Sequence, residues 1–219
     1  MKNGFYFDID GTLLSTKGAG GRSFKKAVLS LFQRIPDWSS IAMAGQLDPG
    51  IFRQILLKLN ETYTDSLWEN FQTLYLDFLA EESQKTASEW IVFEGVREVL
   101  ENLRNNQIPI FLLTGNIQKG AFIKLETLSL AHYFDWENSV FGDDGKEKRE
   151  ELAVILKLKN KDSLHPVIIG DTPDDIKVGK LSGGISIAVS TGLHTHEALQ
   201  KHAPDYLIKT LEDFPFTVF

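Results

Sequence analysis

The chain has 219 residues, of which 42% are hydrophobic, so it is long enough to bury a sizeable core as one large domain or two small ones. Its formal net charge of −7 argues against a nucleic-acid partner, which would favour a basic surface. Because the sequence contains no cysteine, no apolar stretch near the ~18 residues of a membrane span and no basic leader followed by an apolar core, we expect a cytoplasmic protein without a membrane partner.

The first predicted element is a strand within the stretch FYFDIDGTLL, from Phe5 to Leu14. Its aromatic and β-branched residues are typical of a strand that is covered on both faces. Asp8 and Asp10 stand one residue apart at its end, so their side chains point the same way from an extended backbone. Two like charges this close repel each other unless a cation lies between them. The alternative interpretation is an ordinary strand end with acidic turn residues.

The next segment, residues 15–88, carries helical patterns and no convincing strand. Apolar residues recur at helical spacing in three stretches: 23–35, 48–60 and 64–83. We interpret the segment as an all-helical insert placed just after the first strand. The expected domains are therefore a core made of residues 1–14 and 89–219, and a helical cap made of residues 15–88.

From about residue 90 onward, strand-like runs alternate with helix-like ones. The strand-like runs are short and apolar, and they lie at residues 108–115, 166–171, 185–192 and, more weakly, 204–208. Helical spacing marks four further segments: 94–106, 120–134, 147–159 and 173–183. Alternation of this kind predicts βαβ units, and hence an α/β, Rossmann-like core with a parallel sheet and helices on both faces.

Three of the predicted strands end in acidic or hydroxyl side chains. Asp8 and Asp10 end the first strand, Thr114 ends another, and Asp171 ends a third, with Asp175 four residues further on. Ligands bind parallel sheets at the carboxyl ends of the strands. If these strands are neighbours in one sheet, all of these side chains converge on one edge and form a site.

The chemistry of this site suits a metal and a phosphate. Carboxylate oxygens are hard ligands that Mg²⁺ prefers, and a divalent cation would offset the repulsion between Asp8 and Asp171. The Thr114 hydroxyl and the amides after it, at Gly115 and Asn116, are placed to hold phosphate oxygens. A nearby lysine would neutralise charge that develops in the transition state.

Three motifs, DIDGT, LLTGN and IGDTPDD, resemble motifs one, two and four of the haloacid dehalogenase superfamily of phosphatases, in the family's order. The resemblance covers essentially the whole chain, and the helical insert resembles the cap of phosphoglycolate-phosphatase-like members. It implies that Asp8 is the nucleophile and forms an aspartyl-phosphate, while Asp10 is the general acid and base. It also implies that Mg²⁺ is ligated by the carboxylates of Asp8 and Asp171 and the backbone carbonyl of Asp10. Asp175 would steady the metal shell through waters, and Thr114 would bind the transferring phosphoryl group.

The family's third motif, a lysine just ahead of the helix before motif four, matches more loosely. The stretch DDGKEKREEL offers Lys146, Lys148 and Arg149, without the prolines that often follow that lysine. Lys146 stands six residues before Leu152, the spacing usual in the family, so we expect Lys146 to be the catalytic cation. Arg149, at the helix start, is the alternative and a candidate phosphate-binding residue. Lys148 is interpreted as part of a solvated charge run.

We therefore expect a Mg²⁺-dependent phosphatase of small phosphorylated metabolites, acting as a monomer or a homodimer. The alternatives are a phosphotransferase such as a sugar phosphomutase, a 2-haloacid dehalogenase and a non-catalytic phosphate-sensing protein. A dehalogenase needs neither a metal nor an acid–base residue at Asp10, and a sensor would be expected to have lost a catalytic carboxylate. Selectivity among esters is expected on the cap, at Arg22, Lys25 or Arg53.

Overall fold

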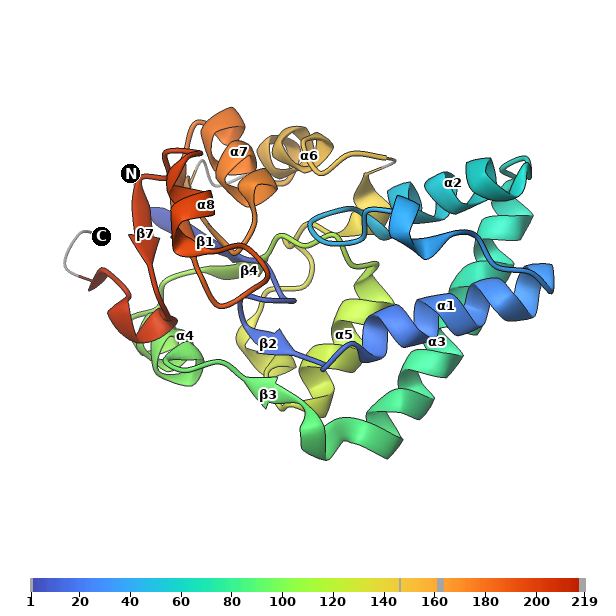
Figure 1. Ribbon diagram of the computed structural model, residues 1–219. Coiled ribbons are helices and arrows are strands. Elements are labelled where there is room, and N and C mark those ends of the chain that lie inside the picture. The colour runs from blue at the N-terminus through green and yellow to red at the C-terminus, as the bar shows by residue number, and fades with distance from the viewer. Residues whose placement is uncertain (1, 146, 161–163, 217–219) are drawn as a thin grey trace.

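A computed structural model describes residues 2–145, 147–160 and 164–216. Its described residues form one sheet of five parallel strands, in the order β4-β1-β5-β6-β7, and a group of helices beside it (Figure 1). The strands of this sheet are β1 (Asn3–Phe7), β4 (Ile110–Leu112), β5 (His165–Gly170), β6 (Ile185–Val189) and β7 (Tyr206–Ile208). The predicted fold class, a parallel-sheet α/β core with an inserted helical cap, is confirmed.

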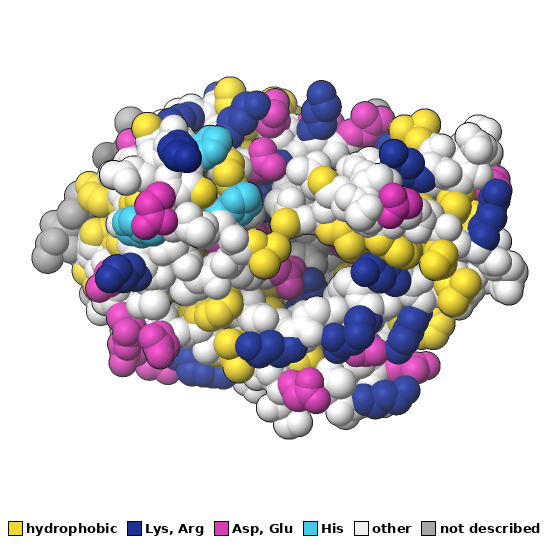
Figure 2. All heavy atoms as spheres, in the orientation of Figure 1, with side chains coloured by type: hydrophobic (Ala, Val, Ile, Leu, Met, Phe, Trp, Pro, Cys, Tyr) yellow, Lys and Arg dark blue, Asp and Glu magenta, His cyan; other side chains and the backbone are white. Residues whose placement is uncertain are grey.

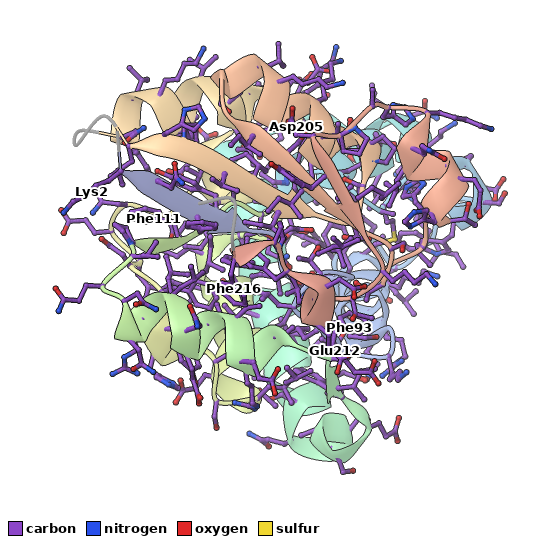
Figure 3. The ribbon with its side chains drawn as sticks, turned by 90° about the vertical axis from the view of Figure 1, so that its left-hand side faces the viewer. Lys2, Phe93, Phe111, Asp205, Glu212 and Phe216 are labelled. Atoms are coloured by element: carbon purple, nitrogen blue, oxygen red, sulfur yellow. The ribbon has the colours of Figure 1, made fainter. Side chains whose placement is uncertain are left out.

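Strand β1 pairs with β4 on one side and β5 on the other, and its side chains alternate between the two faces of the sheet. Phe5 and Phe7 are buried against α4 (Val96–Asn105) and α5 (Gln118–Thr127). Tyr6 packs with residues of α6 (Glu151–Lys159) and α7 (Pro173–Ser182). Figure 3 shows α4 on one side of the sheet and α6 and α7 on the other.

The helical insert has a hydrophobic cluster of its own. It consists mainly of α1 (Ala19–Phe32), α2 (Asp48–Leu59) and α3 (Asp65–Thr86), and no strand lies between residues 16 and 90. The rings of Phe52 and Phe71 stack with their centroids 4.5 Å apart, and Phe24 lies 4.6 Å from Phe71. Because one aromatic from each helix meets the others, the three helices enclose a core distinct from that of the sheet (Figure 1).

Two short strands that the sequence did not predict lie where the chain leaves the sheet and returns to it. β2 (Leu14–Ser15) pairs in antiparallel fashion with β3 (Ile91–Val92). Strands of two residues are too short to show a period of two. Just after β2, Lys17 and Gly18 have φ angles of 51° and 83°, so the backbone turns sharply into α1. The domain limits after residues 14 and 88 stay a prediction, but the segments that lead into and out of the insert lie side by side through the pairing of β2 with β3.

Two predicted helices are shorter than their sequence patterns. The pattern at 120–134 gives way after Thr127, because Ser129 adopts a left-handed backbone conformation with φ 54°. The pattern at 147–159 becomes helical from Glu151 onward, so Arg149 lies in the turn before α6. A short helix, α8 (His196–Gln200), follows β6. None of the described helices combines the length and the apolar character that a membrane crossing needs.

Candidate active site

The carboxyl ends of three adjacent strands bring the predicted carboxylates together. Asp8 directly follows β1 and Asp171 directly follows β5, while Thr114 comes just after β4. All three are buried, with at most 5% of the residue exposed. Carboxylate oxygens of Asp8, Asp171 and Asp175 lie within 4.8 Å of one another. Hard oxygen ligands at this spacing suit a divalent cation such as Mg²⁺.

The glycine of the DIDGT motif is required by the position of Asp171. Gly11 has a φ of 87°, and a Cβ atom on it would lie 2.4 Å from Oδ2 of Asp171. The hydroxyl of Thr12 donates to Oδ1 of the same carboxylate at 3.1 Å. Gly11 and Thr12 therefore hold the segment after β1 against the carboxylate of Asp171, which follows β5.

Asp175 is held at the start of α7 by a capping box. Its Oδ2 accepts hydrogen bonds from the amide and the hydroxyl of Thr172, at 3.1 and 2.7 Å, and Thr172 Oγ1 accepts from the Asp175 amide. Its Oδ1 accepts from Arg149 at 2.5 Å. Both oxygens of Asp175 are thus engaged by the protein, which fits a supporting position beside a metal better than direct ligation.

Arg149 places its guanidinium between two of these carboxylates. One nitrogen, Nη2, lies 3.0 Å from Oδ1 of Asp8 and 2.5 Å from Oδ1 of Asp175, and it also donates to the carbonyl of Leu113. Only 3% of the Arg149 side chain is exposed. Lys148 is exposed on the surface, and Lys146 lies outside the described residues. Of the two candidate cations that the structure describes, Arg149 reaches the acidic cluster.

The acidic cluster carries more negative charge than Arg149 can balance. The pKa of the Asp8 carboxyl is raised to about 6: burial is the largest cause, Arg149 opposes it, and the carboxylates of Asp175 and Asp10 add to it. Burial, with the charges of Asp8 and Asp175, raises the pKa of Asp171 to about 8. A cluster of this kind is stabilised by one more cation or by protons.

Asp10 points to a different cation, Lys124, which the sequence analysis did not single out. Oδ2 of Asp10 accepts from Lys124 Nζ at 2.6 Å and from Asn116 Nδ2 at 2.8 Å. Lys124 also donates to Asn116 Oδ1 at 2.6 Å, so the three side chains form a closed ring. Asn116 further donates to the hydroxyl of Thr114 at 2.8 Å. The predicted acid–base residue and the predicted phosphate-binding loop are thereby tied together.

The sequence held one signal for Lys124. The residues of α5 that are buried are Gly120, Ala121, Lys124 and Leu125, which share one helix face at the spacing i, i+1, i+4, i+5. A lysine on an otherwise small and apolar face is buried against something polar, because an unpaired buried ammonium is costly.

The helical insert docks directly on the loop that follows β4. The backbone amide of Asp48 donates to the carbonyl of Gly115 at 2.9 Å, and Oδ2 of Asp48 accepts from the amide of Ile117 at 2.9 Å. A Cβ atom on Gly115 would lie 2.1 Å from the carbonyl oxygen of Gln46, so only glycine fits this contact. Burial raises the pKa of Asp48 to about 7, although the nearby Lys124 charge lowers it.

A cavity of about 490 Å³ lies between the strand ends and the insert. Asp8, Asp10 and Arg149 line its polar side. The side formed by the insert is largely apolar and includes Phe24, Met43, Ile51 and Tyr75. Figure 2 shows the surface hollowed between the sheet core and the helical insert. This volume is in the range of small-molecule sites.

The cap cations predicted as selectors do not line this cavity. Arg22 forms an ion pair with Glu82 at 2.7 Å, and Lys25 and Arg53 lie over aromatic rings of the insert. The residues of the insert that do face the cavity are mainly apolar.

Comparison with known proteins identifies relatives over almost the whole chain. The family described as haloacid dehalogenase-like hydrolase matches residues 5–189. The chain is 23% identical over 211 residues to a phosphoglycolate phosphatase of Pseudomonas syringae, covering 94% of this chain and 75% of that protein. It is 24% identical over 220 residues to the pyrophosphatase PpaX of Bacillus pumilus, covering 96% of this chain and 94% of that one.

Solved structures share the fold at low sequence identity. A β-phosphoglucomutase of Clostridium difficile superposes with a TM-score of 0.74 at 16% identity, covering 100% of this chain and 95% of that one. A hydrolase of Pseudomonas syringae superposes with a TM-score of 0.72 at 18% identity, covering 99% and 98%.

Proposed function

The chain belongs to the haloacid dehalogenase-like hydrolase family, and from this premise we propose that it is a Mg²⁺-dependent phosphatase of small phosphomonoesters that works through an aspartyl-phosphate on Asp8. The observation that carries the proposal is the position of Asp8. It is buried directly after β1, lines the cavity, and lies 3.0 Å from the guanidinium of Arg149. Relatives named phosphoglycolate phosphatase and pyrophosphatase support the same reaction class.

In the first step, an oxygen of Asp8 forms a bond to phosphorus while the bond from phosphorus to the leaving oxygen breaks. The leaving oxygen takes a proton from Asp10, whose half-exposed side chain lines the same cavity. In the second step, Asp10 takes a proton from water, and the water oxygen bonds to phosphorus as the bond to Asp8 breaks. Orthophosphate leaves, and both carboxyls return to their starting states.

Arg149, rather than Lys146, is the cation that we assign to the phosphoryl group. Its guanidinium already contacts Asp8, so it is placed to contact the phosphoryl oxygens when phosphorus is transferred to that carboxylate. Preorganised donors of this kind act on charge as it develops in the transition state. The Thr114 hydroxyl and the amides of Gly115 and Asn116 are proposed to hold the remaining phosphoryl oxygens.

The residues present fit a divalent cation. Three buried carboxylates share one small volume, and burial together with the neighbouring carboxylates raises the pKa values of Asp8 and Asp171. Asp8 and Asp171, through their carboxylates, and Asp10, through its backbone carbonyl, would hold Mg²⁺. When bound, the ion supplies Lewis-acid stabilisation of the phosphoryl oxygens. Asp175 keeps Arg149 in place from the other side.

The size of the cavity and its cover favour small substrates. The insert lies over the site through the Asp48–Gly115 contact, and the cavity beneath it measures about 490 Å³. A phosphorylated metabolite fits such a space, whereas a phosphoprotein does not. The apolar side chains of the insert would contact the leaving group.

The test is a screen of small phosphorylated metabolites, with released orthophosphate as the readout and Mg²⁺ present or chelated. We expect at least one monoester to be hydrolysed with Mg²⁺ and none with EDTA, and Asp8→Asn to lose more than about a hundredfold in kcat. Release that survives exhaustive chelation would contradict the metal requirement. Consumption of ester without orthophosphate would instead indicate phosphotransfer, and halide release from a 2-haloacid would indicate dehalogenation.

A further inference from the structure

We propose that Lys124 is a positioning residue for Asp10: it fixes one oxygen of the acid–base carboxylate so that the other faces the reacting group. This inference rests on the function proposed above, since it assigns a partner to the acid–base residue of that reaction. It concerns a residue of α5 that the three motifs do not contain.

The geometry directs both donors to the same oxygen. Lys124 Nζ and Asn116 Nδ2 both donate to Oδ2 of Asp10, at 2.6 and 2.8 Å. Oδ1 takes part in neither of these hydrogen bonds, and Asp10 and Lys124 both line the cavity. Because 43% of the Asp10 side chain is exposed, packing alone does not fix its rotamer, and this pair of hydrogen bonds does.

Lys124 itself is held rigidly enough to act in this way. Only 5% of its side chain is exposed, and its ammonium also donates to Asn116 Oδ1 at 2.6 Å. A Cβ atom on Gly20 of α1 would lie 3.3 Å from Nζ, so the insert closes over the ammonium as well. A flexible side chain that is buried, paired and covered loses most of its freedom before substrate arrives.

The two buried cations then have parallel positions. Arg149 lies on Asp8, the proposed nucleophile, and Lys124 lies on Asp10, the proposed acid and base. Asn116 joins the second pair to Thr114 on the phosphate-binding loop. Through Asn116, Lys124 therefore fixes the Asp10 carboxylate relative to the loop that is proposed to hold the phosphoryl group. Lys124 does not itself transfer a proton in this proposal.

The experiment is a double-mutant cycle. Lys124→Met and Asp10→Asn are made singly and together, and Lys119→Met, at an exposed lysine of the same helix, is the matched control. The full chain is assayed with Mg²⁺ on glycerol 1-phosphate and on 4-nitrophenyl phosphate. The readouts are kcat/KM for each ester and the inhibition constant of orthophosphate. Lys124→Gln, which keeps a hydrogen-bond donor, replaces Lys124→Met if thermal unfolding reveals that the latter is not folded.

We expect Lys124→Met to lower kcat/KM for glycerol 1-phosphate by about 10- to 100-fold, and to lower it less for 4-nitrophenyl phosphate, whose leaving group needs little protonation. The inhibition constant of orthophosphate should stay unchanged. In the Asp10→Asn background, the same substitution should cause no further loss, because its effect passes through the Asp10 carboxylate.

Three results would overturn the inference. If Lys124→Met lowers kcat/KM equally with Asp10 and with Asn at position 10, Lys124 acts independently of Asp10. If it lowers kcat/KM equally for both esters, Lys124 has no part in leaving-group protonation. If the inhibition constant of orthophosphate rises by the same factor, Lys124 is a binding residue. Failure of the proposed function is distinguishable from these results. In that case the unsubstituted protein hydrolyses neither ester, or Asp10→Asn alone changes nothing.

Discussion

Arg149 and Lys124 show how much of this site depends on single buried cations. Each is at least 95% buried by side chain and contacts one of the two carboxylates that the proposed reaction uses. Removing Arg149 leaves the buried Asp8 uncompensated, which is more damaging than losing a surface pair, and removing Lys124 takes a hydrogen-bond donor from the half-exposed Asp10. Substitution of either cation is therefore expected to affect the site strongly.

At Arg149 this leads to a prediction that separates the two candidates for the third motif. Arg149→Met should lower kcat/KM by about a hundredfold or more, because a donor to the transferring phosphoryl group is lost and Asp8 and Asp175 are left facing each other. Lys148→Met, an exposed neighbour, is the control. The comparison is made by steady-state kinetics on one ester. A larger loss in Lys146→Met than in Arg149→Met would return the assignment to the lysine.

The carboxylates were predictable from the sequence, and their cations were less so. Asp8, Thr114 and Asp171 follow strand patterns, and the parallel topology alone brings strand ends together. For the cation on Asp8, the spacing in the sequence favoured Lys146 over Arg149, and the structure places Arg149 in the turn before α6. Lys124 lies on the buried face of α5, and no local pattern states which residue a buried ammonium will meet.

At the scale of elements, the contact between α2 and the loop after β4 joins the insert to the core. Asp48, the first residue of α2, accepts from the Ile117 amide just before α5, and its own amide donates to Gly115. The sequence pattern placed both helices but held no information on their mutual docking. The close approach of Gln46 and Gly115 is a tertiary contact between segments about 70 residues apart.

This contact predicts a pH-dependent contribution to stability. Folding raises the pKa of Asp48 from 3.8 to about 7, so between these values the folded state binds more protons at this site than the unfolded state. The carboxyl therefore destabilises the fold increasingly as pH rises from about 4 to about 7. Asp48→Asn keeps an acceptor for the Ile117 amide but cannot ionise. Its free energy of unfolding, relative to that of the unsubstituted protein, should rise across this range.

The measurement is urea unfolding in EDTA at about pH 5 and about pH 8, because most of the pH range over which Asp48 changes the stability lies between these values. Asp77→Asn, at an exposed carboxylate of α3, corrects for the change in net charge. If the difference between Asp48→Asn and the unsubstituted protein is the same at both pH values, Asp48 does not titrate as its burial implies.

At the scale of the whole molecule, the alternation of apolar strands and amphipathic helices was sufficient to predict the parallel sheet, because such a sheet needs a crossover helix between strands. The insert was recognisable by the absence of a strand pattern. The sequence did not predict the pairing of β2 with β3 or the cavity between the sheet core and the helical insert, because both arise only when segments far apart in the chain meet.

The proposed reaction requires that Asp8 becomes phosphorylated during turnover. Without the base at position 10, an aryl phosphate should still phosphorylate Asp8, because its leaving group needs little protonation, but hydrolysis of the aspartyl-phosphate should be slow. Asp10→Asn is therefore mixed with 4-nitrophenyl phosphate and Mg²⁺, then quenched with borohydride, which reduces an acyl phosphate to an alcohol. Peptide mass spectrometry should find Asp8 converted to homoserine only when the ester is present. Release of nitrophenol with Asp8 left unmodified would contradict a reaction through an aspartyl-phosphate on Asp8.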